Sequence, residues 1–112
     1  MLYSPGAVVI LDFPGVQQTK RRPAVILSSN TYHATRPDLI IGLITSQTGA
    51  ANNPTDVLLQ DWGSAGLRLP SAFRAFIVTL PQSAVLEHIG RLTENDWQAV
   101  RQRAATALDI CD

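Results

Sequence analysis

The chain has 112 residues, a length that suits one domain with a core of its own. Apolar residues make up 46% of it and charged residues 16%, which excludes the polar composition of a disordered chain. The net charge is zero, which excludes attraction of nucleic acid by overall charge, so any binding of phosphates must come from a local cluster.

Cysteine content and the N-terminal residues indicate the compartment. Cys111 is the single cysteine, which excludes an internal disulfide and a cysteine-rich metal motif and favours a reducing compartment. The first residues lack the basic segment and long apolar run of a signal peptide or membrane span. We therefore expect a cytoplasmic chain that does not enter the membrane.

The first half of the chain alternates apolar runs with polar loops. Residues 7–13 form a short apolar run rich in β-branched residues and predict a strand, followed by a polar loop over 15–21. A second strand is predicted over 23–28 and a second polar loop over 29–38. Residues 39–46 are almost entirely apolar and predict a third strand in the centre of a sheet.

The second half continues with shorter strands. A loop over 47–54 precedes a short predicted strand over 56–59. Residues 61–71 contain glycines and are expected to be irregular, and 73–80 predict a fifth strand. A sixth, short strand is expected over 88–92.

The C-terminal segment changes to a helical period. Thr93 is a suitable N-cap, and Asp96 three residues later suggests an acidic capping box. Apolar residues then recur at helical spacing over about four turns: Trp97, Val100, Ala104, Ala107 and Leu108. Strands without helical crossovers, followed by one helix, predict a mainly β (α+β) domain over 1–112, with an antiparallel sheet that curls into a small barrel.

Catalytic motifs of the common kinds are missing from the sequence. It contains no P-loop, no GxGxxG, no HExxH and no GxSxG, and its two histidines, His33 and His88, lack metal-ligand spacing. We expect no metal and no cofactor. The informative cluster is Lys20, Arg21 and Arg22 at the start of the second strand, which suits phosphate binding but also suits a charged gatekeeper beside an apolar strand.

The order of several short motifs resembles the MazF/PemK family of toxin ribonucleases. A strand ending in Asp12-Phe13-Pro14-Gly15 leads through Gln18 to an Arg-Pro pair and an aliphatic strand, residues 22–28. The phrases Leu43-Ile44-Thr45-Ser46 and Ile89-Gly90-Arg91-Leu92 follow in the expected order. The resemblance covers nearly the whole chain.

This resemblance implies an SH3-like barrel of the CcdB/PemK type with a C-terminal helix, usually dimeric. Such toxins cleave single-stranded RNA at short sequences without a metal and are neutralised by a cognate antitoxin. The family's catalytic residues map onto Arg22 and Thr45. Cleavage would use the 2′-hydroxyl and leave a 2′,3′-cyclic phosphate and a 5′-hydroxyl. RNA-binding roles are expected for Gln18, Lys20, Arg21, Ser46, Gln47 and Arg74.

Several assignments stay open at the level of sequence. His33 is a candidate general base, although an ordinary loop histidine is the preferred interpretation. Tyr32 and Trp62 are candidates for stacking on unpaired bases, with packing an equal alternative for Trp62. The chain also departs from the family, which often has Glu where Gln17 stands and Glu-Gln-x-Arg in the strand that here reads residues 74–78.

Two other functions are compatible with the same scaffold. One is a CcdB-like protein that poisons DNA gyrase by protein contact, for which the pair Arg22 and Thr45 would be unnecessary. The other is a family member that binds RNA without cleaving it, which the departures at Gln17 and in the fifth strand keep open.

Overall fold

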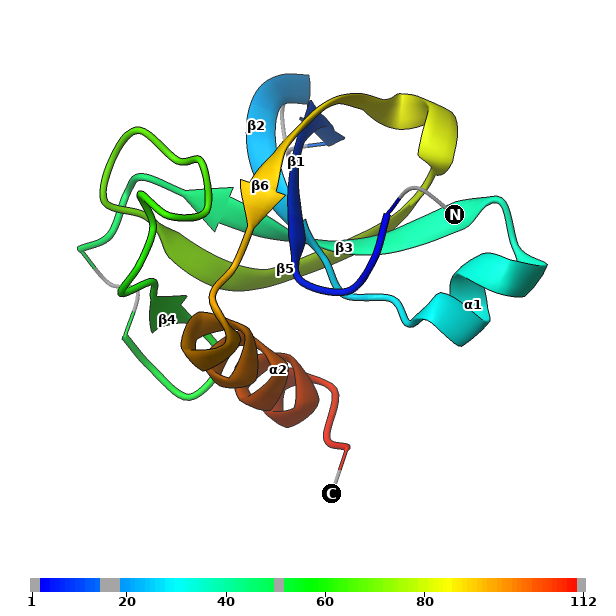
Figure 1. Cartoon of the computed structure of the whole chain (residues 1–112). Helices are drawn as coiled ribbons and strands as arrows, with labels where there is room; N and C mark the ends of the chain where they lie inside the picture. The colour runs from blue at the N-terminus through cyan, green and yellow to red at the C-terminus, as the bar shows by residue number, and fades with distance from the viewer. Residues whose placement is uncertain (1–2, 15–18, 50–51, 111–112) are drawn as a thin grey trace.

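A curled antiparallel sheet with a helix against one face makes up the computed structural model, which describes residues 3–14, 19–49 and 52–110 (Figure 1). In chain order the elements are β1 (Ala7–Pro14), β2 (Thr19–Ile26), α1 (Asn30–Thr35), β3 (Asp38–Thr45), β4 (Val57–Leu58), β5 (Ala72–Pro81), the 3₁₀ turn η1 (Gln82–Ala84), β6 (Val85–Arg91) and α2 (Glu94–Ala107). The mainly β class with a C-terminal helix is confirmed.

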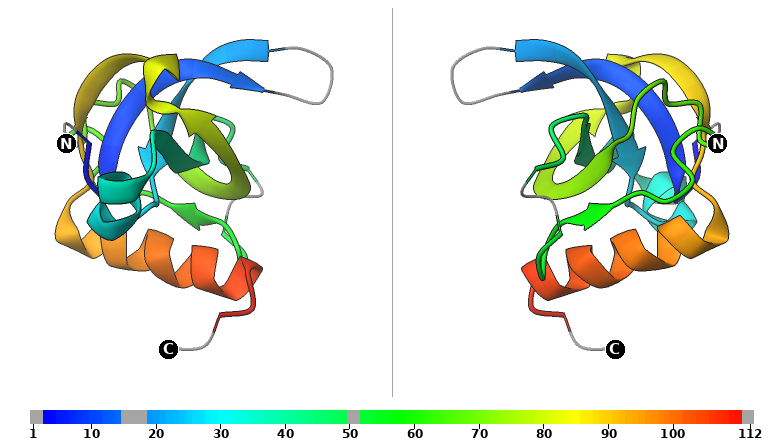
Figure 2. Two further views of the ribbon diagram at one scale, coloured as in Figure 1. Left: turned by 90° about the vertical axis from the view of Figure 1, so that its right-hand side faces the viewer. Right: turned by 90° about the vertical axis from the view of Figure 1, so that its left-hand side faces the viewer.

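The strands are ordered β4-β5-β3-β2-β1-β6, and neighbours in this order pair antiparallel. β4 and β6 therefore form the two edges, and the sheet curls like a barrel without closing. Figure 2 shows how strongly β1 and β2 bend over the remaining strands while α2 runs beneath the sheet. Within the described residues no helix is long and apolar enough to cross a membrane.

Strand β2 begins earlier than the sequence predicts. The expected loop over 15–21 is wrong for its last three residues, because Thr19, Lys20 and Arg21 pair with the end of β1. A polar stretch gains ladder hydrogen bonds wherever a neighbouring strand continues, whatever its hydrophobicity. The cationic cluster is therefore held on a strand.

Helix α1 lies inside the segment 29–38 that the sequence predicts to be a loop, so that prediction is wrong. Ser29 caps the helix by accepting a hydrogen bond from the Tyr32 N–H at 3.1 Å. The helix has six residues and buries one side chain, that of His33. A segment this short does not show a helical period in its sequence.

Helix α2 begins as predicted, with Thr93 accepting a hydrogen bond from the Asp96 N–H at 3.3 Å. The Asp96 carboxylate does a different task from the one expected of a capping box. It is buried and accepts the backbone N–H groups of Gln60 and Asp61 at 2.9 and 2.8 Å, which fixes the start of the loop between β4 and β5. Leu108 at the far end is exposed rather than buried.

Two apolar clusters pack on opposite faces of the sheet, since successive side chains of a strand alternate between faces. The helix core lies between the sheet and α2 and includes Val8, Val25, Ile44, Phe73 and Val100. The sheet core lies inside the curl and includes Val9, Leu11, Ala24, Ile26, Ile41 and Leu43. β3 contributes to both cores, which explains why its sequence is almost continuously apolar.

Candidate functional site

A hollow of about 620 Å³ opens beside the start of β2, on the face of the sheet that carries the helix core. Its size falls within the range of roughly 300–1,000 Å³ that is usual for small-ligand sites. Its lining is Ile10, Arg21, Arg22, Pro23, Ile44, Ser46, Gly66, Leu67, Arg68, Leu69, Ser71, Glu87, His88 and Ile89. Three guanidinium groups and one carboxylate thus surround an aliphatic floor.

Strand register brings the floor and one wall together. Ile10 of β1 pairs with Pro23 on one side and Glu87 on the other, and all three line the hollow. Residues opposite one another in adjacent strands share a face of the sheet, so Glu87 projects on the same side as Ile10. A carboxylate far along the chain is in this way placed beside the cationic start of β2.

Another wall is a loop packed tightly against β6. Gly66 has φ +89°, a left-handed conformation that glycine adopts without steric cost. A Cβ atom on Gly90 would overlap the Ala65 carbonyl and come within 2.6 Å of its carbon. Two glycines therefore allow the backbones of the loop and β6 to touch, which sets the width of the hollow.

Arg22 is half-buried and has no hydrogen-bond or ion-pair partner within the described part of the chain. Thr45 is 5% exposed and does not line the hollow, although both of its neighbours do. The pairing of β2 with β3 ends at Ala24 and Leu43, and an unchanged register would set Arg22 across from Thr45. The two residues implied to be catalytic thus lie at the same end of adjacent strands.

The other cations of the cluster are held differently. Arg21 is exposed and forms an ion pair with Asp12, with 3.4 Å between Nε and Oδ1. Lys20 lies on β2 opposite Phe13. Gln17 and Gln18 lie outside the described residues. Of this group, Arg21 and Arg22 line the hollow.

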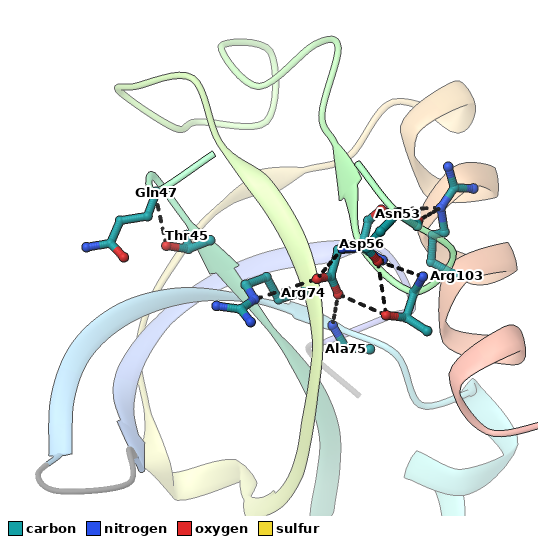
Figure 3. A network of polar contacts seen from close by, with 8 residues as sticks. Thr45, Gln47, Asn53, Asp56, Arg74, Ala75 and Arg103 are labelled. Carbon is teal, nitrogen blue, oxygen red and sulfur yellow. Dashed lines mark hydrogen bonds and ion pairs between the residues drawn. The ribbon is translucent and has the colours of Figure 1, made fainter. Parts of the chain in front are cut away.

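Beyond the end of β3 the chain turns with help from Thr45. Its Oγ1 accepts a hydrogen bond from the Gln47 N–H at 3.1 Å (Figure 3). Ser46 between them is exposed and lines the hollow, whereas Gln47 is exposed outside it. Among the described residues the Thr45 hydroxyl donates to no acceptor, so its hydrogen is available for one.

Arg74 and Gln47 lie on different sides of Thr45, and Arg74 belongs to a network of polar contacts around Asp56 (Figure 3). A bulge in the pairing of β3 with β5 sets Arg74 opposite Leu43 and leaves the Ala75 N–H free to donate to Asp56 Oδ1 at 3.0 Å. The Asn53 amide also donates to Asp56, and Arg74 Nε lies 3.7 Å from its Oδ2.

The environment of Asp56 stabilises its charged form. Burial acts to raise the pKa of the carboxyl, but the hydrogen bonds from the Ala75 N–H and the Asn53 amide and the charge of Arg74 outweigh burial, so its pKa lies below the ordinary value. Arg103 of α2 donates to the carbonyl oxygens of Asn53 and Asp56, at 3.0 and 3.3 Å, and ties this network to the helix.

Three residues considered from sequence lie away from the hollow. His33 is buried in α1, where its Nε2 lies 2.5 Å from Ser28 Oγ, and Ser28 in turn accepts the Ile40 N–H. These hydrogen bonds join α1 to β3. His33 is therefore neither an ordinary loop histidine nor a base beside Arg22, the two interpretations that the sequence allows. The Arg36 guanidinium lies over the Tyr32 ring, with its Cζ atom 5.4 Å from the ring centroid. Trp62 packs against the helix core.

Sequence reasoning missed Arg68 and Glu87, which line the hollow, and Asp56, which holds Arg74. Arg68 comes from a loop without regular structure, and the position of Glu87 depends on pairing between the first and last strands. No local motif marks such residues. Among the described residues, no three His, Cys, Asp or Glu side chains cluster as a metal site would require.

The family model for PemK-like, MazF-like toxins of type II toxin–antitoxin systems matches residues 4–108. The chain therefore belongs to this family, and the resemblance seen in its sequence motifs is confirmed. A comparison with curated proteins gave no significant match.

Solved structures of similar fold agree with this membership. An endoribonuclease from a mycobacterial species in complex with its cognate antitoxin is 23% identical, with 98% of each chain covered and a TM-score of 0.78. MazF from Deinococcus radiodurans is 23% identical over 98% of this chain and 99% of that one, with a TM-score of 0.76. Toxin MazF-mt6 from Mycobacterium tuberculosis is 20% identical, covers 95% and 99%, and has a TM-score of 0.73.

Proposed function

We propose that this chain is the toxin of a type II toxin–antitoxin pair and acts in the cytoplasm as a metal-independent endoribonuclease on single-stranded RNA. Family membership supports the toxin role. The observation that carries the nuclease is Arg22, a half-buried guanidinium in the hollow without a polar partner among the described residues. An arginine that no carboxylate neutralises is available to a phosphate.

The reaction proposed is an internal transesterification. The 2′-oxygen attacks the adjacent phosphorus as its proton leaves, the bond from phosphorus to the 5′-oxygen breaks, and the 5′-oxygen takes up a proton. The products are a 2′,3′-cyclic phosphate and a free 5′-hydroxyl. Negative charge grows on the non-bridging oxygens in the transition state, and a planar, permanently charged guanidinium such as that of Arg22 stabilises it.

The remaining predicted residues are given supporting roles. The Thr45 hydroxyl, whose oxygen already accepts the Gln47 N–H, donates its hydrogen to the scissile phosphate or orients the 2′-hydroxyl. RNA phosphates and bases are bound by Gln18, Lys20, Arg21, Ser46, Gln47 and Arg74. Arg74 is given a phosphate contact in the strand where many relatives carry Glu-Gln-x-Arg.

Protein partners form part of the same proposal. The mycobacterial endoribonuclease and MazF from Deinococcus radiodurans were each solved with an antitoxin or MazE bound. A second groove of about 370 Å³ runs between α2 and the sheet, and exposed Leu108 and Ile110 lie at its rim. We assign this chain a cognate antitoxin and a homodimeric state. Light scattering measures the mass of the purified protein with and without the co-expressed antitoxin and so tests both assignments.

The nuclease is tested with a long, weakly structured RNA in EDTA, with the new 5′ ends mapped. The protein is expected to cut at a recurring short sequence, and Arg22→Ala to lower the rate roughly 100- to 1,000-fold. Arg36→Ala is the matched control, since Arg36 is exposed, lies outside the hollow and pairs with Asp38. Cleavage by Arg22→Ala at the parental rate would overturn the assignment, and intact RNA with the parent would overturn the nuclease.

A further inference from the structure

The hollow contains one acidic side chain that the proposed cleavage does not use. Glu87 projects from the edge strand β6 beside Ile10, and arginines from β2 and from the loop at Arg68 line the same space. A carboxylate lowers the affinity for phosphate, so a site for phosphate alone would be better without it. The lining therefore suits a ligand that presents hydrogen-bond donors to Glu87 and acceptors to the arginines.

Part of the lining of the hollow is aliphatic. Ile10 and Ile44 come from neighbouring parts of the sheet, and Leu67 and Ile89 contribute from the loop and from β6. Apolar walls with a few convergent polar groups are the usual lining of a site for a planar, partly polar ring. An unpaired nucleobase, splayed out of a single strand, has this character and presents its Watson–Crick edge.

Among the four bases, guanine fits this arrangement best. An ionised carboxylate offers two parallel acceptors, and only guanine carries two adjacent donors, N1–H and the N2 amino group, on one edge. Its O6 and N7 are acceptors, which arginine binds with two hydrogen bonds. Adenine and cytosine offer a single amino group beside an acceptor, and uracil offers one N–H between two acceptors.

We propose that the hollow is a guanine-binding subsite, in which Glu87 accepts from N1–H and N2 and Arg68 or Arg21 donates to O6 and N7. The subsite lies beside Arg22, so a guanine bound there belongs to the recognition sequence at a position near the scissile phosphate. This inference rests on the proposed function for its substrate, single-stranded RNA, and adds the identity of one base.

Binding of mononucleotides tests the subsite without any cleavage. The full chain is titrated with 3′-GMP, 3′-AMP, 3′-CMP, 3′-UMP and 3′-IMP, and isoleucine methyl shifts are followed by NMR. Ile10, Ile44 and Ile89 line the hollow, whereas Ile40, Ile77 and Ile110 line the groove beside α2 and serve as internal controls. We expect GMP to bind about tenfold more tightly than the other three common nucleotides and to shift the first set of methyls.

Substitutions then assign the selectivity to Glu87. Inosine lacks the N2 amino group, so 3′-IMP should bind several-fold more weakly than 3′-GMP. In Glu87→Gln one acceptor becomes a donor, so the preference should move from GMP to AMP, because a side-chain amide matches adenine. Glu94→Gln is the matched control: Glu94 is exposed on α2, bonded to Gln98, and outside the hollow. Equal binding of all nucleotides, or an unchanged preference in Glu87→Gln, would overturn the subsite.

RNA cleavage separates this inference from the nuclease. If the parent cuts RNA at sites that share no guanine, the subsite is refuted and the nuclease stands. If the parent leaves RNA intact but binds 3′-GMP selectively through Glu87, the nuclease is refuted and the subsite stands.

Discussion

Arg21, Arg22 and Arg74 carry the same side chain, but they differ in what holds each guanidinium. Arg21 is paired with Asp12 on an exposed surface, where such pairs contribute little stability, and the exposed Arg74 guanidinium lies beside the buried Asp56 carboxylate. Arg22 has no such partner among the described residues and is half-buried. Its charge is therefore the one that a bound phosphate would neutralise, whereas the other two must first exchange a carboxylate for a phosphate.

His33 gives the fold a dependence on pH. Burial lowers the pKa of its imidazole below the ordinary 6.5, and the nearby Tyr3 backbone offsets part of this shift. The folded state then binds a proton less readily than the unfolded state. Stability from neutral His33 is complete above pH 6.5 and is lost as the pH falls below 6.5 toward the lowered value.

We therefore expect the urea concentration at the unfolding midpoint to decrease when the pH is lowered from 7.5 to 5. His33→Gln should show a flatter profile over this range, because the titrating group has been removed. His88→Gln is the matched control: His88 is exposed, and this variant should keep the parental slope. A parental profile that is flat, or one that His88→Gln flattens instead, would contradict the role given to His33.

At the scale of the elements, β6 and the loop between β4 and β5 depend on each other. The loop begins where Asp96 binds the N–H groups of Gln60 and Asp61, and it touches β6 at Gly66 and Gly90. These contacts fix the positions of the loop with Arg68 and of β6 with Glu87, which both line the hollow. The shape of the site is therefore determined by backbone packing as much as by its side chains.

Gly90→Ala should separate the loop from β6. The added methyl would overlap the Ala65 carbonyl, so the loop must move, at an expected cost of about 1–3 kcal/mol in the free energy of unfolding. Urea unfolding measures the cost, and 3′-GMP titration should show weaker binding. A Cβ on Gly63 in the same loop meets nothing within 4 Å, so Gly63→Ala should match the parent in both measurements. Parental stability and binding in Gly90→Ala would exclude this coupling.

Sequence patterns predicted those elements whose residues alternate or recur over a long enough span. The continuous apolar run of β3 and the helical apolar period of α2 each predict the element to within a residue or two. α1 was missed because six residues with one buried side chain hold no measurable period, and the start of β2 was missed because its pairing partner is what makes it a strand. Of the candidate site residues that the sequence indicates, Arg21, Arg22 and Ser46 line the hollow, and their roles remain predictions, whereas Glu87 is placed there only by the pairing of β6 with β1.

At the scale of the whole molecule, the charge is balanced but unevenly placed. The chain has nine basic and nine acidic residues, yet three arginines and one glutamate line the hollow. Attraction of RNA is therefore local and should be moderate. Each phosphate neutralised on a single strand contributes a slope of about −0.7 to the plot of log affinity against log salt.

We expect a slope of about −2 for a short 2′-deoxy strand, which cannot be cleaved, measured by fluorescence anisotropy from low to moderate salt. Arg22→Ala should reduce the magnitude of this slope by about 0.7, because one phosphate contact is lost. Arg36→Ala, with its arginine outside the hollow, should leave the slope unchanged. An equal reduction in both variants would mean that general surface charge, rather than the hollow, binds the strand.

The pairing of the first strand with the last has a consequence for biosynthesis. Ala7 lies opposite Arg91, and β1 needs both β2 and β6 as neighbours. During translation β1 leaves the ribosome before the other strands of this sheet, and its second neighbour, β6, is the last of them to follow. Glu87 and Ile89, which complete the hollow, arrive with that strand. The nascent chain therefore cannot assemble the hollow before β6 has been made, so under the proposed function the message that encodes the chain would be spared until β6 has emerged.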